Sequence, residues 1–112
     1  MERVVRAVPV KSKQALQAFA AQSAEWPAAE KKQFLSYFGD AVEQWYFQEI
    51  EGKPYVIAIA EGTRLSEGYA KYPDLDDPYF NWFSEQVLAL CGVDLRKIPH
   101  AAESELIYTL SP

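Results

Sequence analysis

The chain has 112 residues, of which 49% are hydrophobic, and a net charge of −5. This length and composition exclude a disordered chain and predict one globular domain over residues 1–112. The 11 basic residues are scattered along an acidic chain, which argues against nucleic acid or an anionic membrane as a partner. There is no secretory signal and no apolar run long enough to span a bilayer, so we expect a cytoplasmic protein.

The first third of the chain predicts a strand followed by a long helix. Residues 3–10, RVVRAVPV, are rich in β-branched side chains and predict the strand. Ser12 can cap a helix, and apolar residues then recur at helical spacing over 12–38. Trp26-Pro27 should break or kink this helix, because proline disfavours the helical conformation in the residue before it.

The middle of the chain predicts a β-hairpin. Residues 42–50, VEQWYFQEI, and 54–60, PYVIAIA, are strand-like and are joined by a short link that contains glycine. Both strands carry bulky side chains on both faces, so the sheet needs two covers. The predicted helices supply only one cover. We therefore expect a second copy of the chain to supply the other, as a homodimer.

The aromatic segment 72–83, YPDLDDPYFNWF, reads mainly as the entrance to a helix over 78–91. Asp77 suits the N-cap position and Pro78 the first helical position. Most of the aromatic side chains then share one face of the helix and are expected in the core. Trp82 points away from that face. It is covered by the preceding loop, buried between subunits, or part of a ligand wall.

The remaining segments complete the predicted order of elements. Residues 64–71 predict a short helix, 93–102 are irregular, and 103–110, ESELIYTL, alternate as a last strand. The result is an α+β fold with the ferredoxin-like β-α-β-β-α-β layout. This layout predicts one four-stranded antiparallel sheet in each subunit.

Polar side chains along the strand 42–50 are candidates for a ligand site. Gln44, Tyr46 and Gln48 share one face of this strand. They could hydrogen-bond a small ligand in a pocket, or they could satisfy contacts at a subunit interface. The sequence leaves these two interpretations open.

Arg6 is a second candidate, because it shares a strand face with Val4 and Val8. A charge on such a face requires a carboxylate or an anionic ligand, since burying it unpaired is costly. Glu43 and Glu49 are the natural partners for a structural ion pair.

His100 is the candidate acid–base residue, because its unperturbed pKa suits proton transfer near neutral pH. Cys91 is the single cysteine, which excludes an intrachain disulfide and a cysteine-based zinc site. Asp74 and Asp76 have no third ligand at suitable spacing. No motif for nucleotide, dinucleotide or zinc-peptidase chemistry occurs, so we expect neither a metal nor a cofactor.

The element order, together with strands that are apolar on both faces, resembles the dimeric α+β barrel superfamily. In those proteins two ferredoxin-like sheets pack face to face as a homodimer, and a ligand cavity often lies between sheet and helices. Small members with strands like WYFQEI and PYVIAIAEG are the most similar. The resemblance implies a homodimer and a small-molecule ligand.

The L-rhamnose mutarotase family is similar in layout. The Trp26-Pro27 break, the YFNWF helix start at 79–83 and SELIYTL at 104–110 resemble that family. Its catalytic histidine precedes the Trp-Pro pair, whereas the corresponding turn here is AAQSAEWP, with Gln22 at the nearest position. Glutamine cannot exchange protons near neutral pH. Mutarotase activity would therefore need another acid–base group.

These observations predict a homodimeric small-molecule-binding protein of the dimeric α+β barrel type. The predicted cavity residues are Gln44, Tyr46, Gln48, Trp26, Trp82 and Arg6. The alternative is an enzyme, either a mutarotase-like isomerase or a cofactor-independent monooxygenase, with His100 as acid–base. A third hypothesis is an assembly module whose barrel is filled.

Overall fold

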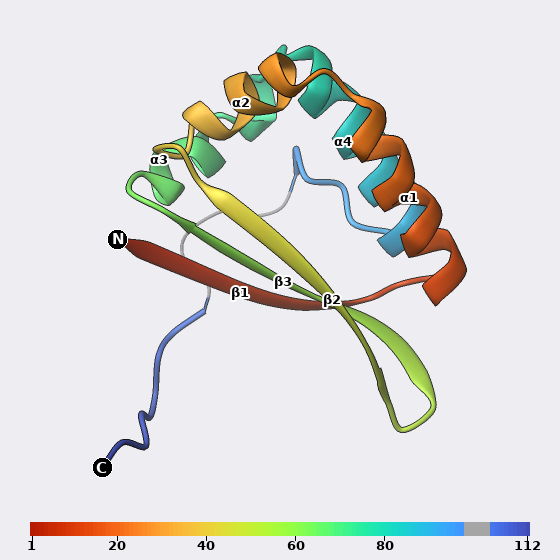
Figure 1. Ribbon diagram of the computed structural model, residues 1–112, viewed down its shortest axis with the longest axis vertical. Coiled ribbons are helices and arrows are strands. Elements are labelled where there is room, and N and C mark those ends of the chain that lie inside the picture. Colours follow the sequence, from red (N-terminus) through yellow and green to blue (C-terminus); the bar gives the residue numbers. More distant parts are fainter. Residues whose placement is uncertain (98–103) are drawn as a thin grey trace.

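The computed structural model describes residues 1–97 and 104–112 and has an α+β fold, which confirms the predicted fold class. All helices lie on one side of the sheet (Figure 1). The elements in chain order are β1 (Glu2–Pro9), α1 (Lys13–Glu25), α2 (Ala28–Ser36), β2 (Val42–Ile50), β3 (Lys53–Gly62), α3 (Leu65–Ala70), the 3-10 turn η1 (Tyr72–Asp74) and α4 (Pro78–Cys91).

The helix boundaries follow local signals in the sequence. The Ser12 hydroxyl accepts from the backbone N–H of Ala15 at 3.0 Å and starts α1. The Asp77 carboxylate accepts from the backbone N–H of Phe80 at 2.9 Å and starts α4. Trp26 adopts an extended conformation before Pro27, with ψ of 143°. The predicted break is therefore confirmed, and it divides the segment into two separate helices.

The sheet is antiparallel, with β3 between β1 and β2. Arg6 lies opposite Ala58, and Ala58 lies opposite Trp45, so these three residues share one face. This inner face is turned toward the helices, and comprises Val4, Arg6, Val8, Glu43, Trp45, Phe47, Val56, Ala58 and Ala60. The outer face comprises Arg3, Val5, Ala7, Pro9, Val42, Gln44, Tyr46, Gln48, Ile50, Lys53, Tyr55, Ile57, Ile59 and Glu61.

An aromatic layer lies between the helices and the inner face. Phe80 is fully buried, and its ring stacks on that of Phe34 with centroids 5.8 Å apart. Trp82 stacks on Phe19 of α1, with centroids 5.4 Å apart, and lies 5.7 Å from Trp26. Helix α1 therefore covers Trp82, whereas the sequence predicted that the preceding loop, a second subunit or a ligand would cover it.

The predicted fourth strand at 103–110 does not form: residues 104–112, which we call the tail, contain no strand. The tail starts beside β1, because the N–H of Val5 donates to the Ser104 hydroxyl at 2.9 Å. It then leaves the body of the molecule (Figure 1). An antiparallel strand that starts opposite Val5 has only residues 2–4 of β1 left to pair with. The described sheet therefore has three strands, and the four-stranded ferredoxin-like layout is not confirmed.

In the part of the chain that the structure describes, no helix is both long and apolar enough to pass through a bilayer.

Candidate functional site

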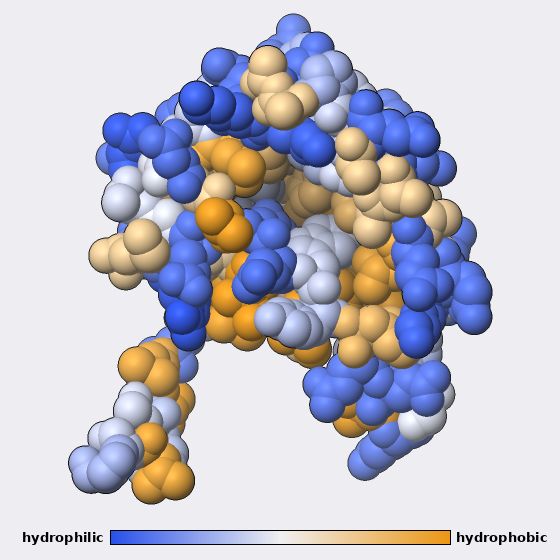
Figure 2. Space-filling model, in the orientation of Figure 1, coloured by the Kyte–Doolittle hydropathy of each residue, from blue (hydrophilic) through white to orange (hydrophobic). Residues whose placement is uncertain are grey.

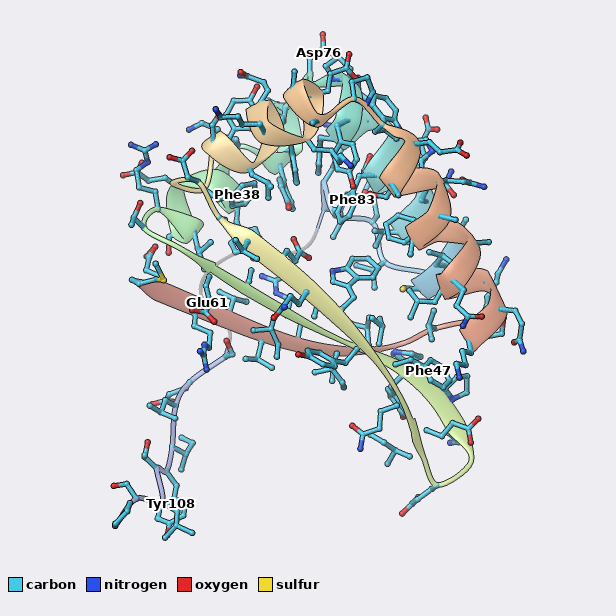
Figure 3. The ribbon with its side chains drawn as sticks, in the orientation of Figure 1. Phe38, Phe47, Glu61, Asp76, Phe83 and Tyr108 are labelled. Carbon is cyan, nitrogen blue, oxygen red and sulfur yellow. The ribbon has the colours of Figure 1, made fainter. Side chains whose placement is uncertain are left out.

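A cavity of about 510 Å³ lies between the inner face of the sheet and the helices. Figure 2 shows the molecule hollowed between the helices and the strands, with hydrophobic side chains around the hollow. Phe83 of α4 points into this space (Figure 3) and lines the cavity. We call this space the Arg6 cavity, after the cationic side chain on its floor.

The alternation of β3 explains why the space is there. In PYVIAIA, the small side chains Ala58 and Ala60 face inward, whereas the larger Ile57 and Ile59 face outward. A central strand that covers a filled core normally places its larger side chains inward. The small inward residues leave room between the strand and the aromatic layer.

Arg6 is the polar group of greatest interest in the cavity. Its Nε and Nη2 atoms are buried and have no hydrogen-bond partner. The guanidinium lies over the ring of Tyr69, 4.9 Å from the centroid. Among the described residues the ion pairs are Arg3–Glu61, Arg64–Glu67 and Lys97–Asp94, so none includes Arg6. Buried unpaired donors are costly, and an acceptor from a ligand would relieve that cost.

Glu43 lies on the same face, in β2. Its carboxyl oxygen Oε1 accepts from Trp45 Nε1 at 2.6 Å. Burial raises the pKa of Glu43, although the hydrogen bond from Trp45 and the charge of Arg6 act to lower it. The neutral carboxyl is therefore favoured more than it would be in water. The other titratable groups that line the two cavities beside Glu43 are Arg6, Lys31, Tyr69, Tyr72, Tyr79 and Cys91.

The tyrosines and the cysteine of the cavity are held in their neutral forms. Burial, followed by the nearby charge of Glu43, raises the pKa of Tyr69 to about 12. The same two causes raise the pKa of Tyr72 well above its usual range. Burial also raises the pKa of Cys91, so its thiol is not activated as a nucleophile. These groups suit binding better than proton abstraction near neutral pH.

A second cavity of about 330 Å³ adjoins the first, beneath α1 and α2. Glu43, Trp45 and Phe83 line both cavities and stand at the boundary between them. The hydroxyls of Ser23 and Tyr79, which belong to residues lining the second cavity, are hydrogen-bonded to each other at 2.8 Å. Two of the polar groups that line the second cavity therefore already have a hydrogen-bond partner within the protein.

The structure does not bring the six predicted ligand-binding residues together. Arg6 lines the large cavity. Gln44, Tyr46 and Gln48 lie on the outer face, on the opposite side of the sheet, and all three are exposed. The alternation of side chains along β2 explains this position, because successive residues of a strand point to opposite faces. Their position on the outer face separates these three residues from the Arg6 cavity.

The other predicted residues lie elsewhere. Trp26 and Trp82 line a shallow surface groove with Gln22, away from the residues that line the Arg6 cavity. His100 lies outside the described residues, so its role as acid–base stays a prediction. Within residues 1–97 and 104–112, no three histidine, cysteine or acidic side chains gather as a metal site.

The sequence interpretation missed Glu43, Trp45, Tyr69 and Tyr72 as cavity residues. A signal was present for the first two, because they alternate with Gln44 and must face away from it. The two tyrosines come from α3 and η1, and nothing local in the sequence indicates that these segments reach the cavity.

Comparisons with known proteins do not identify a relative. No protein-family model matches the chain, and neither a curated protein nor a solved structure matches it. The resemblance to the dimeric α+β barrel superfamily therefore stays a prediction. The site has to be interpreted from the geometry of its own residues.

Proposed function

We propose that this protein binds a small, largely apolar molecule in the Arg6 cavity. The observation that carries the proposal is a cavity of about 510 Å³ that Arg6 lines, with two donors of this side chain buried and without a hydrogen-bond partner. Ligand sites are typically concave and apolar, about 300–1,000 Å³ in volume, with a few polar groups that orient the ligand. The Arg6 cavity matches this description in size and in chemistry.

A thermal-shift screen with a cavity-filling variant tests the proposal. The screened compounds are sugars, small phenols, quinones and small organic acids. Ala58 lies between Arg6 and Trp45 on the inner face, so Ala58→Leu places extra carbon atoms inside the cavity. Compounds that raise the melting temperature of the wild type should fail to raise that of Ala58→Leu. The control is Ala18→Leu at an exposed position of α1, which should respond like the wild type.

Two results would contradict the cavity proposal. One is a wild-type melting temperature that no compound changes. The other is an Ala58→Leu variant that binds every compound as well as the wild type, because binding would then lie elsewhere. A circular dichroism spectrum of Ala58→Leu shows whether the variant is folded.

We propose further that a second copy of the chain covers the outer face of the sheet. Val5, Val42, Tyr46 and Ile50 are exposed there, and Tyr46 retains 54% of its surface. No described helix lies on that side (Figure 1). Apolar patches of this kind on a small protein are typical of interfaces.

The chemistry of the outer face suits a copy of itself. Gln44 and Gln48 are uncharged, and Arg3 is paired with Glu61 at 2.9 Å, so Lys53 at the hairpin end carries the remaining charge of this face. In a two-fold dimer each patch meets an identical patch. A strongly charged face would repel its copy, whereas this largely apolar face is compatible with one. This argument favours a second copy over an oppositely charged partner.

The tail supports the same proposal. Leu106, Tyr108 and Leu110 alternate with other residues, and are 82%, 72% and 83% exposed. Figure 3 shows Tyr108 well away from the sheet. In its own chain the tail has only residues 2–4 of β1 as a partner edge beyond Val5. A second sheet packed on the outer face brings further apolar surface and strand edges within reach.

Sedimentation equilibrium tests the dimer. The expected result at micromolar concentration is twice the chain mass of 12.7 kDa. A mass near 12.7 kDa would contradict the proposal.

A further inference from the structure

The unpartnered atoms of Arg6 are the two that form one edge of the guanidinium. Nε–H and one N–H of Nη2 point in the same direction, at a spacing that matches the two oxygens of a carboxylate. Both atoms are buried and lack a partner. A single hydroxyl or ether oxygen can accept well from only one of them. An acceptor with two oxygens in one plane satisfies both.

The charges around the cavity limit the ligand to a monoanion. Arg6 is the cationic side chain among the described residues that line it, and the other ionisable groups there are Glu43, Tyr69, Tyr72 and Cys91. A phosphate dianion carries more charge than one guanidinium balances and more oxygens than its edge can bind. A carboxylate matches the single positive charge and its two donors.

Glu43 does not take the place of this anion. Its carboxyl is held by Trp45 Nε1 at 2.6 Å, and it forms no ion pair with Arg6. Burial raises the pKa of Glu43, which favours its neutral form beside Arg6. Glu43 therefore leaves Nε and Nη2 of Arg6 without an acceptor.

The side chains that line the cavity indicate the chemistry of the rest of the ligand. The aromatic rings of Trp45, Tyr69, Tyr72 and Phe83 line the cavity above the small residues Ala58 and Ala60. Flat aromatic rings stack or pack edge to face on such walls. We infer that the ligand is a small monocarboxylic acid with an aromatic or branched apolar body, its carboxylate bound to Nε and Nη2 of Arg6. This inference rests on the proposed function of the cavity.

The test compares acids with neutral molecules of the same shape. The probes are benzoate and phenylacetate, their amides, and phenyl phosphate, added to ¹⁵N-labelled protein. The arginine Nε–H signals in a ¹H–¹⁵N spectrum report directly on Arg6. The carboxylates should shift the Arg6 signal, and the amides should bind about ten-fold more weakly or worse, since they lose a charge-assisted pair.

Matched arginine variants separate Arg6 from general charge effects. Arg6→Gln should weaken benzoate binding about ten-fold or more. Arg3→Gln is the same substitution in the same strand, on the outer face, and should leave binding unchanged. The Nε–H signal of the wild type keeps the test valid if Arg6→Gln does not fold.

The outcomes distinguish the inference from the proposed function. Amides that bind as tightly as acids, or an Arg6 signal that does not move on binding, would overturn the carboxylate inference and leave the cavity as a ligand site. Tighter binding of phenyl phosphate than of benzoate would overturn it in favour of phosphate esters. Failure of every probe and every screened compound to bind would remove the proposed function itself.

Discussion

Replacing Tyr46 by aspartate should dissociate the proposed dimer. Tyr46 lies halfway along the edge strand β2, on the outer face and opposite Ile57 of the central strand, and exposes 54% of its surface in the single chain. The substitution removes an aromatic ring and places one negative charge from each copy in the proposed interface. The inner face and the Arg6 cavity are not altered by a change on this side of the sheet.

The size of the effect follows from the exposed area. An aromatic side chain buries roughly 200 Å² when fully covered, so about 100 Å² of Tyr46 remains available. At about 25 cal/mol per Å², covering it contributes about 2.5 kcal/mol in each copy and about 5 kcal/mol in a symmetric dimer. Each 1.4 kcal/mol corresponds to about a ten-fold change in Kd. We therefore expect Kd to rise by roughly three to four orders of magnitude.

Sedimentation velocity over a dilution series measures this change. Tyr46→Asp should sediment as a monomer at concentrations where the wild type is a dimer, with little change in the monomer's fold. Gln17→Asp adds the same charge to an exposed position of α1 and should behave as the wild type. Identical sedimentation of wild type and Tyr46→Asp across the series would refute the assignment of the outer face as the interface.

Three further predictions concern the cavity and its surroundings. Burial raises the pKa of Glu43 above 4.5, so the folded state favours the neutral carboxyl. The stability gained from this protonation is fully present below pH 4.5 and is lost as the pH rises through the raised pKa. Glu43→Gln should therefore gain stability relative to wild type from pH 4.5 toward neutrality in urea unfolding, and parallel pH profiles would contradict this. His100→Ala should leave benzoate binding unchanged if the protein is a binder, and L-rhamnose anomer exchange at the rate of buffer alone, measured by NMR, would remove the mutarotase alternative. Gly68→Ala should cost about 1–3 kcal/mol in the free energy of unfolding, because a Cβ there overlaps the Phe38 ring, and unchanged stability would show that the ring can move aside.

The helix ends and strand segments were readable from the sequence because their causes are local. Ser12 and Asp77 cap the helices that they were expected to cap, and Pro27 breaks the helix before it. The alternation of 42–50 likewise separated Glu43 and Trp45 from Gln44. These features depend on neighbours within a few residues, so one sequence is enough to show them.

The sequence did not show in the same way which face of the sheet meets the helices. Trp45 and Phe47 on one side of β2 are as bulky as Tyr46 and Ile50 on the other, so the strand alone does not decide which side meets the helices. Gln44, Tyr46 and Gln48 were predicted to line the cavity because three polar side chains share one strand face, with a subunit interface as the open alternative. A shift of one residue in register exchanges the two faces of a strand, and only the packed helices settle which one is inside.

The last predicted strand shows a second limit. The alternation of Leu106, Tyr108 and Leu110 is typical of a strand, and Ser104 does reach β1. A strand also needs a partner edge, and beyond Val5 the chain's own β1 has only the three residues 2–4 to offer. A pattern in the sequence indicates the tendency to pair, whereas the fold determines whether a partner is present.

The free energy of unfolding of Arg6→Met, measured in urea without added ligand, tests most directly whether Arg6 is kept for binding. Methionine has a similar length and no charge to bury. Since the Nε and Nη2 atoms of Arg6 have no partner in the structure, the variant should be at least as stable as the wild type, and more stable by about 1–3 kcal/mol if the buried donors are fully dehydrated. A loss of several kcal/mol would show that the folded chain itself depends on the guanidinium, and would contradict a ligand site built around it.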